Sequence, residues 1–149
     1  MIAIHRKLFA AIACAALALP LGSIAAEEPG KAVAAQKERV VIQVSDADPQ
    51  KWNLALNNAK NVQVDLGADK TEVEIVAYGP GIGMLKADAI VANRIEDAVA
   101  AGVKVVACEN TMKAQKLSRD DMNRKVDYVA AGVVELMRRQ QQGYAYIRP

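Results

Sequence analysis

The sequence predicts a three-layer α/β domain built on a mainly parallel sheet of about five strands. Short β-branched segments alternate along the chain with longer segments whose apolar residues recur every three or four positions. The connections between them are short, as is typical of parallel sheets with helices on both faces. An apolar share of 52% and a charged share of 24% indicate a folded domain with a core rather than a disordered chain.

Residues 1–25 have the layout of a secretion signal. Basic residues at 5–7 precede an apolar run at 8–19, which is shorter than a membrane span. Small residues then offer a cleavage site after Ala25 or Ala26. We therefore expect export to the periplasm.

Removal of this signal leaves a polar tether at 26–38 and one domain at 39–149, with no membrane segment. Two alternatives are open: an uncleaved membrane anchor, and a lipoprotein site at Cys14, which lies early in the apolar run.

The first strand is predicted at 39–45, because its β-branched run suits a strand buried on both faces. Asp48 is a suitable N-cap and Pro49 a suitable first residue for the following helix. That helix has one apolar stripe as far as Leu66, and Gly67 ends it.

The second strand is predicted at 71–79, where alternating residues become fully apolar. A glycine-rich loop at 80–87 follows it. A helix at 88–102 comes next, with Asp88 as its cap and Gly102 as its end.

The second half of the chain continues the alternation and completes the sheet. We expect a strand at 103–109, one or two short helices in 110–123 with Ser118 as a cap, a strand at 125–131, a helix at 132–143 and a short strand at 144–149.

Charge and residue counts exclude several classes of protein. Without Arg6 and Lys7 the 19 basic residues become 17, equal to the 17 acidic residues, so the net charge is zero. No basic cluster with interleaved aromatic residues follows, which argues against nucleic-acid binding. His5 is the only histidine and lies in the signal. Histidine triads and histidine zinc sites are thereby excluded, and we predict no metal and no cofactor.

Cys108 is the only cysteine outside the signal, so an internal disulfide is excluded. In an exported protein such a cysteine is a buried core residue, an inter-chain disulfide or a working thiol. Asn110 or Thr111 can cap the next helix, whose N-terminus would favour the thiolate. Glu109 would oppose this effect if its carboxylate turned to the sulfur.

The carboxyl ends of parallel strands are where ligands and catalytic groups collect. We therefore predict a site at this edge with Cys108 as the reactive residue. The supporting or binding residues we expect are Asn110, Thr111, Gly79, Gly81 and Asp46. The glycine-rich loop lacks the spacing of a nucleotide-binding motif, and a tight turn is its simpler interpretation. Helix capping is likewise the simpler role for the acidic residues after the first strand.

Four segments together resemble the DsrE/DsrF-like family, in its exported branch of small single-domain members: "VIQVSDADPQKWNLALNNAKN", "EIVAYGPGIGML", "GVKVVACENTMKA" and "AAGVVELMRRQQQGYAYIRP". The resemblance covers about residues 39–149. It implies a three-layer α/β fold and a homo-oligomer, and in sulfur-relay relatives a cysteine that carries a persulfide. The matching residue here is Cys108.

The functional hypothesis is a periplasmic sulfurtransferase or sulfur carrier that holds sulfane sulfur on Cys108. Its partners would be a small sulfur compound or another protein's thiol, because the domain has no second cysteine to resolve the intermediate. The alternative is a non-catalytic oligomeric binding module in which Cys108 is structural.

Overall fold

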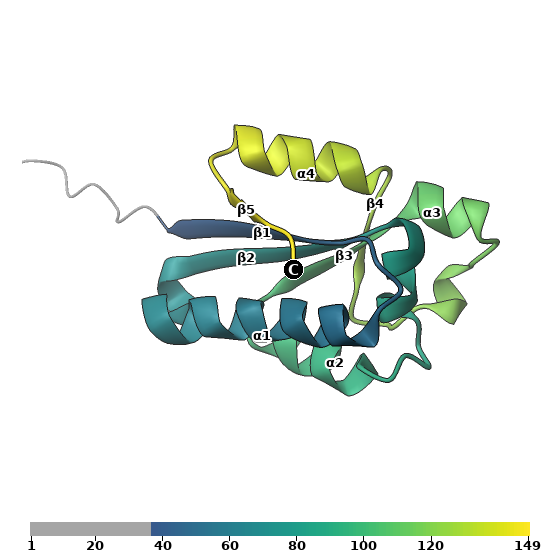
Figure 1. Cartoon of the computed structure of the whole chain (residues 1–149), viewed down its shortest axis with the longest axis horizontal. Helices are drawn as coiled ribbons and strands as arrows, with labels where there is room; N and C mark the ends of the chain where they lie inside the picture. Colours follow the sequence, from purple (N-terminus) through teal and green to yellow (C-terminus); the bar gives the residue numbers. More distant parts are fainter. Residues whose placement is uncertain (1–36) are drawn as a thin grey trace, which may run out of the picture. The chain divides into compact units, whose positions relative to one another are not determined.

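The computed structural model describes residues 37–149. The predicted signal and the tether up to residue 36 lie outside the described residues. Five strands form one parallel sheet in the order β4-β3-β2-β1-β5, with α1 and α2 on one face and α4 on the other (Figure 1). The predicted fold class is confirmed. The main elements are β1 (Glu38–Val44), α1 (Pro49–Leu66), β2 (Thr71–Ala77), α2 (Ala92–Ala100), β3 (Lys104–Cys108), α3 (Glu109–Ala114), β4 (Asp127–Val129), α4 (Gly132–Gln141) and β5 (Ala145–Ile147).

The first helix begins and ends where the sequence predicts. The Asp48 carboxylate accepts a hydrogen bond from the backbone N–H of Gln50 at 2.8 Å, and Pro49 is the first helical residue. At the other end the Gly67 N–H donates to the carbonyl of Gln63 at 3.0 Å, and the φ of 93° at Gly67 turns the chain out of the helix. This cap and the glycine fix both ends of α1 locally.

The segment between β2 and α2 differs from the prediction. The glycine-rich loop forms a 3₁₀ helix, η2 (Gly79–Leu85), which buries three apolar side chains. α2 begins at Ala92 rather than at residue 88, and Asp88 is exposed and does not cap it. The reason lies in two successive turns, in which Ala89 N–H bonds to Lys86 and Ala92 N–H bonds to Ala89.

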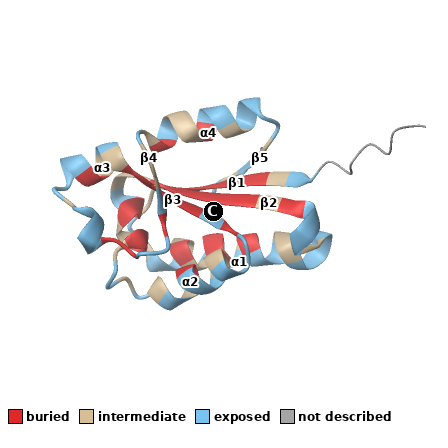
Figure 2. Cartoon of the chain, turned by 180° about the vertical axis from the view of Figure 1, so that it is seen from behind, coloured by how far each residue is buried: buried red, intermediate tan, exposed pale blue. Residues whose placement is uncertain are grey.

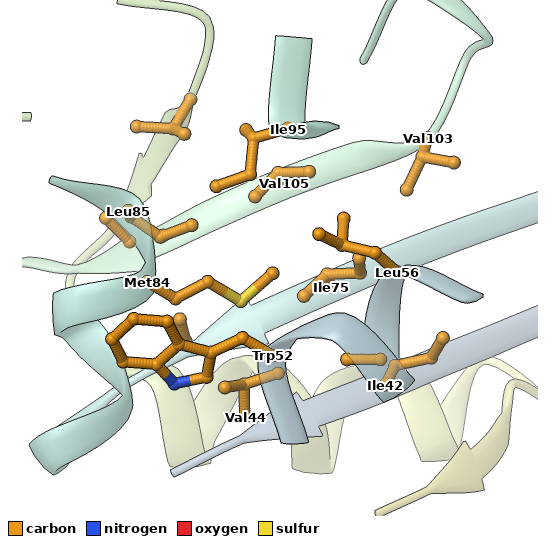
Figure 3. Close-up of a cluster of buried hydrophobic side chains, with 14 of the residues drawn as sticks. Ile42, Val44, Trp52, Leu56, Ile75, Met84, Leu85, Ile95, Val103 and Val105 are labelled. Carbon is orange, nitrogen blue, oxygen red and sulfur yellow. The ribbon is translucent and has the colours of Figure 1, made fainter. Parts of the chain in front are cut away.

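The two faces of the sheet are covered unequally. The larger core lies between the sheet and the α1–α2 layer, where Trp52 packs beside Met84 and Ile75 (Figure 3). On the α4 face the buried apolar cluster consists only of Val41, Val76, Val106 and Leu136. Figure 2 shows the central strands buried and the outer sides of the helices exposed. The α4 face therefore leaves room for polar groups, and both sites described below lie there.

Candidate thiol site

Cys108 is both the last residue of β3 and the N-cap residue of α3. Side chains alternate along a strand, so Cys108 lies on the same face as Val106, which packs under α4. The first helical residue is Glu109, directly after the cysteine, so Cys108 occupies the cap position that was predicted for Asn110 or Thr111. The cysteine is 5% exposed and is therefore buried.

The surroundings of the sulfur lower the pKa of Cys108 below that of an ordinary thiol. Burial is the largest single effect and raises this pKa, because it disfavours the charged form. Hydrogen bonds from the Thr111 hydroxyl and from the N–H groups of Gly132 and Thr111 lower it, and together they outweigh burial. The Asn110 N–H contributes least, and it also donates to the carbonyl of Ala130 at 3.1 Å.

The loop after β2 orients the Thr111 hydroxyl. The Gly79 N–H donates to Thr111 Oγ1 at 2.9 Å, which leaves the hydroxyl proton free for the sulfur. Gln115 donates to the Gly79 carbonyl at 3.2 Å, so α3 and the residue after it hold both polar groups of this glycine. Gly79 has a φ of 53°, a conformation that favours glycine. Of the predicted supporting residues, Thr111 and Asn110 thus act on the thiol directly, and Gly79 acts through Thr111.

The N-terminus of α4 closes the site from the other side. A Cβ atom at Gly132 would lie 3.3 Å from Cβ of Cys108 and 3.0 Å from Cβ of Tyr78. A side chain there would push on both residues, so the glycine allows the first turn of α4 to approach the sulfur. The N–H groups of a first turn have no partner within their helix, and one of them is available to the thiol. Gly132 and Tyr78 were not predicted from the sequence, because their place beside Cys108 depends on the packing of α4.

Glu109 does not oppose the thiolate in the way its position suggested. Its carboxylate is paired with the Arg119 guanidinium at 2.8 Å, and Arg119 lies over the Tyr128 ring at 4.3 Å. A surface depression of about 420 Å³ lies beside this pair and includes Asn110 in its lining. Cys108 does not line it.

The other two predicted supporting residues lie away from the sulfur. Gly81 is buried against β1, where a Cβ would be 2.4 Å from the carbonyl oxygen of Val44, so its role is close backbone approach. Asp46 follows β1, two strands from β3 and hence about 10 Å across the sheet. Its carboxylate pairs with Lys51 at 3.2 Å, and its carbonyl accepts the Trp52 indole N–H at 2.7 Å.

Within residues 37–149, no three His, Cys, Asp or Glu side chains are grouped as a metal site would need. No helix in this described part is both long and apolar enough to cross a membrane.

The fold and the thiol define a class: single-domain parallel α/β proteins with a cysteine at the carboxyl end of a central strand. The chain belongs to the DsrE/DsrF-like family, whose model matches residues 38–149, and this family is generally linked to sulfur relay.

Solved structures agree with this assignment. A protein of unknown function from Methanobacterium thermoautotrophicum, MTH1491, is 34% identical and superposes with a TM-score of 0.72, covering 76% of this chain and all of its own. A protein of unknown function from Bacteroides thetaiotaomicron, BT1422, is 13% identical, with a TM-score of 0.62 over 75% of this chain and 95% of its own. The ychN protein from E. coli is 14% identical, with a TM-score of 0.62 over 75% of this chain and 99% of its own. The last two show the fold alone. No curated protein matches the chain in sequence.

Proposed function

We propose that this protein carries sulfane sulfur as a persulfide on Cys108 and passes it to an acceptor thiol. The observation that supports this proposal best is the convergence of hydrogen-bond donors on the thiol from α3 and α4. The same donors suit the charged outer sulfur of a persulfide, because the N–H groups belong to helix starts and the Thr111 hydroxyl is held in place by the Gly79 N–H.

The transfer consists of two exchange steps that need no oxidant or reductant. The Cys108 thiolate attacks the outer sulfur of a persulfide R–S–SH, a new S–S bond forms, and R–S⁻ leaves. An acceptor thiolate then attacks the outer sulfur on Cys108, takes it as its own persulfide and restores the Cys108 thiolate. Both steps follow the logic of thiol–disulfide exchange.

Burial of Cys108 requires the site to open before it reacts. The thiol is covered by the start of α4 and lies beside Tyr78, which touches the same glycine. Movement of either segment would admit a small sulfur compound. Burial between turnovers would also protect the persulfide from other thiols.

Mass spectrometry after incubation with polysulfide tests this proposal directly. We expect a mass increase of one or more sulfur atoms on Cys108, reversed by an added small thiol. The matched control is Cys108→Ser, which keeps the size of the side chain and offers no thiol. If the wild-type protein gains no sulfur mass after incubation with polysulfide, the proposal is contradicted.

A second function is favoured by one observation, the 5% exposure of Cys108. In that case the protein is a non-catalytic oligomeric binding module and the cysteine is a small core residue. It predicts that Cys108 resists alkylation in the native protein, and that Cys108→Ala changes stability but not function. The rate of alkylation as a function of pH separates the two functions, because a working thiol reacts as its thiolate. A covalent dimer on a non-reducing gel would instead support an inter-chain disulfide.

We further propose export to the periplasm, on the basis of the apolar run at 8–19. Fractionation of cells that express the full chain or a chain starting at residue 26 tests it. The full chain is expected in the periplasm at reduced mass, and the shortened chain in the cytoplasm.

A homo-oligomer is proposed on the basis of α4, whose outer side carries two exposed apolar residues one turn apart, Val133 (62%) and Met137 (51%). Residues at this spacing form one stripe on a helix. Sedimentation of the wild type and of Met137→Lys tests the proposal. A smaller assembly in the variant supports it, and a monomeric wild type contradicts it.

A further inference from the structure

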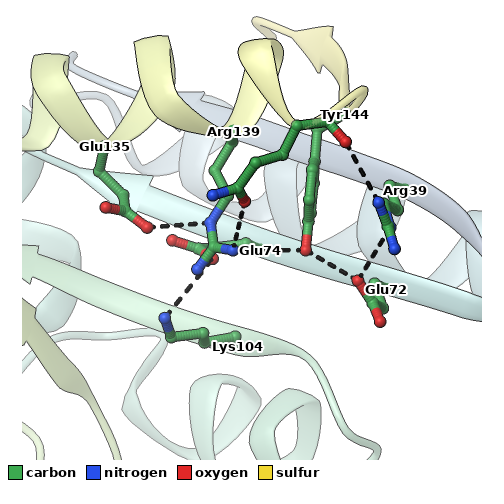
Figure 4. A network of polar contacts seen from close by, with 8 residues as sticks. Arg39, Glu72, Glu74, Lys104, Glu135, Arg139 and Tyr144 are labelled. Carbon is green, nitrogen blue, oxygen red and sulfur yellow. Dashed lines mark hydrogen bonds and ion pairs between the residues drawn. The ribbon is translucent and has the colours of Figure 1, made fainter.

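A buried carboxylate lies in the middle of the sheet, under α4. Glu74 is the fourth residue of β2 and is 2% exposed. Its Oε2 atom pairs with the Arg139 guanidinium of α4 at 2.7 Å and with Lys104 Nζ of β3 at 3.6 Å (Figure 4). A buried charge needs such partners, and here one of them comes from α4. Glu74 therefore links the helix to the sheet.

A second carboxylate meets the same guanidinium. Glu135, one turn before Arg139 on α4, pairs with Arg139 Nε through its Oε1 atom at 2.9 Å. Figure 4 shows the carboxylates of Glu74 and Glu135 next to each other at this guanidinium. The Oε1 atom of Glu74 is buried and accepts no hydrogen bond. An unpartnered buried carboxylate oxygen beside another carboxylate is costly when both are ionised.

The other charged groups around the two carboxylates already have partners of their own. On β2, Glu72 accepts a hydrogen bond from the Tyr144 hydroxyl at 2.9 Å and pairs with Arg39 of β1 at 3.3 Å. Arg139 and Arg39 both lie near the Tyr144 ring, at 5.2 Å and 5.9 Å from its centroid. None of these groups donates a hydrogen bond to the free oxygen of Glu74. A proton on one of the two carboxyl groups would supply that hydrogen bond.

We propose that Glu74 and Glu135 share one proton, and that its loss at rising pH weakens the attachment of α4 to the sheet. The apolar attachment of α4 is small, since Leu136 is its one large buried side chain. The polar cluster therefore carries much of the contact. When the proton leaves, two adjacent carboxylates share one guanidinium and repel each other, and the ammonium group of Lys104, partly exposed and 3.6 Å from Glu74, compensates this repulsion only in part. This inference stands without the proposed function.

The electrostatic surroundings agree with this geometry. Burial raises the pKa of Glu74, the neighbouring Lys104 and Arg139 lower it, and the adjacent Glu135 raises it, with a net increase above the ordinary value of 4.5. An acid whose pKa is raised on folding stabilises the fold most at a pH where it is protonated in both the folded and the unfolded chain. This contribution is present below pH 4.5 and is lost as the pH rises through the folded-state pKa.

The cluster also bears on the thiol, because the first residue of α4 is the glycine packed on Cys108. Glu135 lies in the first turn of the same helix. A weaker attachment of α4 should therefore expose the sulfur. The rate at which Cys108 reacts with a neutral alkylating reagent then reports the opening of α4, whatever the protein does in the cell.

A carbon-13 NMR titration of the side-chain carboxyl groups in the wild-type protein tests the shared proton and requires no variant. We expect the Glu74 carboxyl to titrate above 4.5, the ordinary value for glutamic acid. Titration of Glu74 at or below that value would overturn the proposal.

The variant that tests the attachment is Glu135→Gln, whose amide can donate to the free oxygen of Glu74 at any pH. We expect its unfolding free energy to vary less with pH than that of the wild type, and Cys108 to be alkylated more slowly at neutral pH. Asp65→Asn, an exposed acid-to-amide change on α1, is the matched control and should behave as the wild type. Equal pH dependence and equal alkylation in Glu135→Gln and the wild type would overturn the proposal.

Discussion

Replacement of Thr111 by valine removes the strongest stabilising group of the thiolate while keeping the shape of the side chain. The Thr111 hydroxyl is the leading hydrogen-bond contribution that lowers the pKa of Cys108. Without it, burial and the remaining N–H donors are left, so the pKa of Cys108 should rise. Thr111→Ser keeps a hydroxyl and is the matched control.

The size of the effect follows from the strength of one hydrogen bond to a charged group. Such a bond contributes about 1.5–3 kcal/mol. Since about 1.4 kcal/mol corresponds to a factor of ten, the thiolate population below the pKa falls roughly 10- to 150-fold. A more basic thiolate is also a better nucleophile. With a Brønsted coefficient of about 0.4–0.5, this effect offsets nearly half of the loss on a logarithmic scale. The net rate with a small disulfide should therefore fall about three- to twentyfold at neutral pH.

The assay is the second-order rate of reaction with an aromatic disulfide across a pH series, with thiolate absorbance as a direct titration. Valine also removes the acceptor of the Gly79 N–H, so the site can open more readily and react faster. Amide hydrogen exchange at Gly79 measures this opening, and the rates are compared after correction for it. If the valine and serine variants titrate alike, Thr111 does not stabilise the thiolate and the reasoning about the site is wrong.

Three further changes test the fold that positions the site, each by chemical denaturation. Gly81→Ala should lower the free energy of unfolding by about 1–3 kcal/mol, because the new Cβ would lie 2.4 Å from a backbone oxygen. Gly83→Ala is its matched control and should lower it less, because the Cβ there would lie 3.4 Å from a tryptophan ring. Ile75→Ala should lower the free energy of unfolding by about 2–5 kcal/mol, since Ile75 is 0% exposed. Ile90→Ala is its matched control and should lower it by roughly 0.5 kcal/mol or less, since Ile90 is 76% exposed. Asp48→Ala should cost about 0.5–2 kcal/mol through loss of the α1 cap. Equal costs within a matched pair, or no cost at the cap, would contradict these assignments.

The edges of several elements were predictable because local chemistry determines them. The helix α1 begins with Asp48 as its cap and Pro49 as its first residue, and it ends at Gly67, as expected. Gly102 follows α2 in a left-handed conformation. The start of α2 was not predictable in the same way. Asp88 has the right residue type for a cap, but two turns stabilised by backbone hydrogen bonds delay the helix to Ala92.

The candidate site was predicted in part. Cys108, Thr111 and Gly79 lie together because the ends of adjacent parallel strands meet at one edge, which strand order alone suggests. Gly81 and Asp46 lie at the same edge, but Gly81 packs against the backbone of β1 and Asp46 forms an ion pair with Lys51. Nothing local distinguishes these two outcomes.

The amino-acid sequence by itself determined the alternation of strands and helices, the family and Cys108 as the one cysteine outside the predicted signal, because periodicity, caps and composition are properties of neighbouring residues. Only the tertiary structure decided what surrounds that cysteine and the acid in the middle of β2. The Gly132 N–H at the start of α4 reaches the sulfur, and Arg139 reaches Glu74, because α4 crosses the sheet face at one place. Such contacts join distant segments, and their distances depend on how the layers pack.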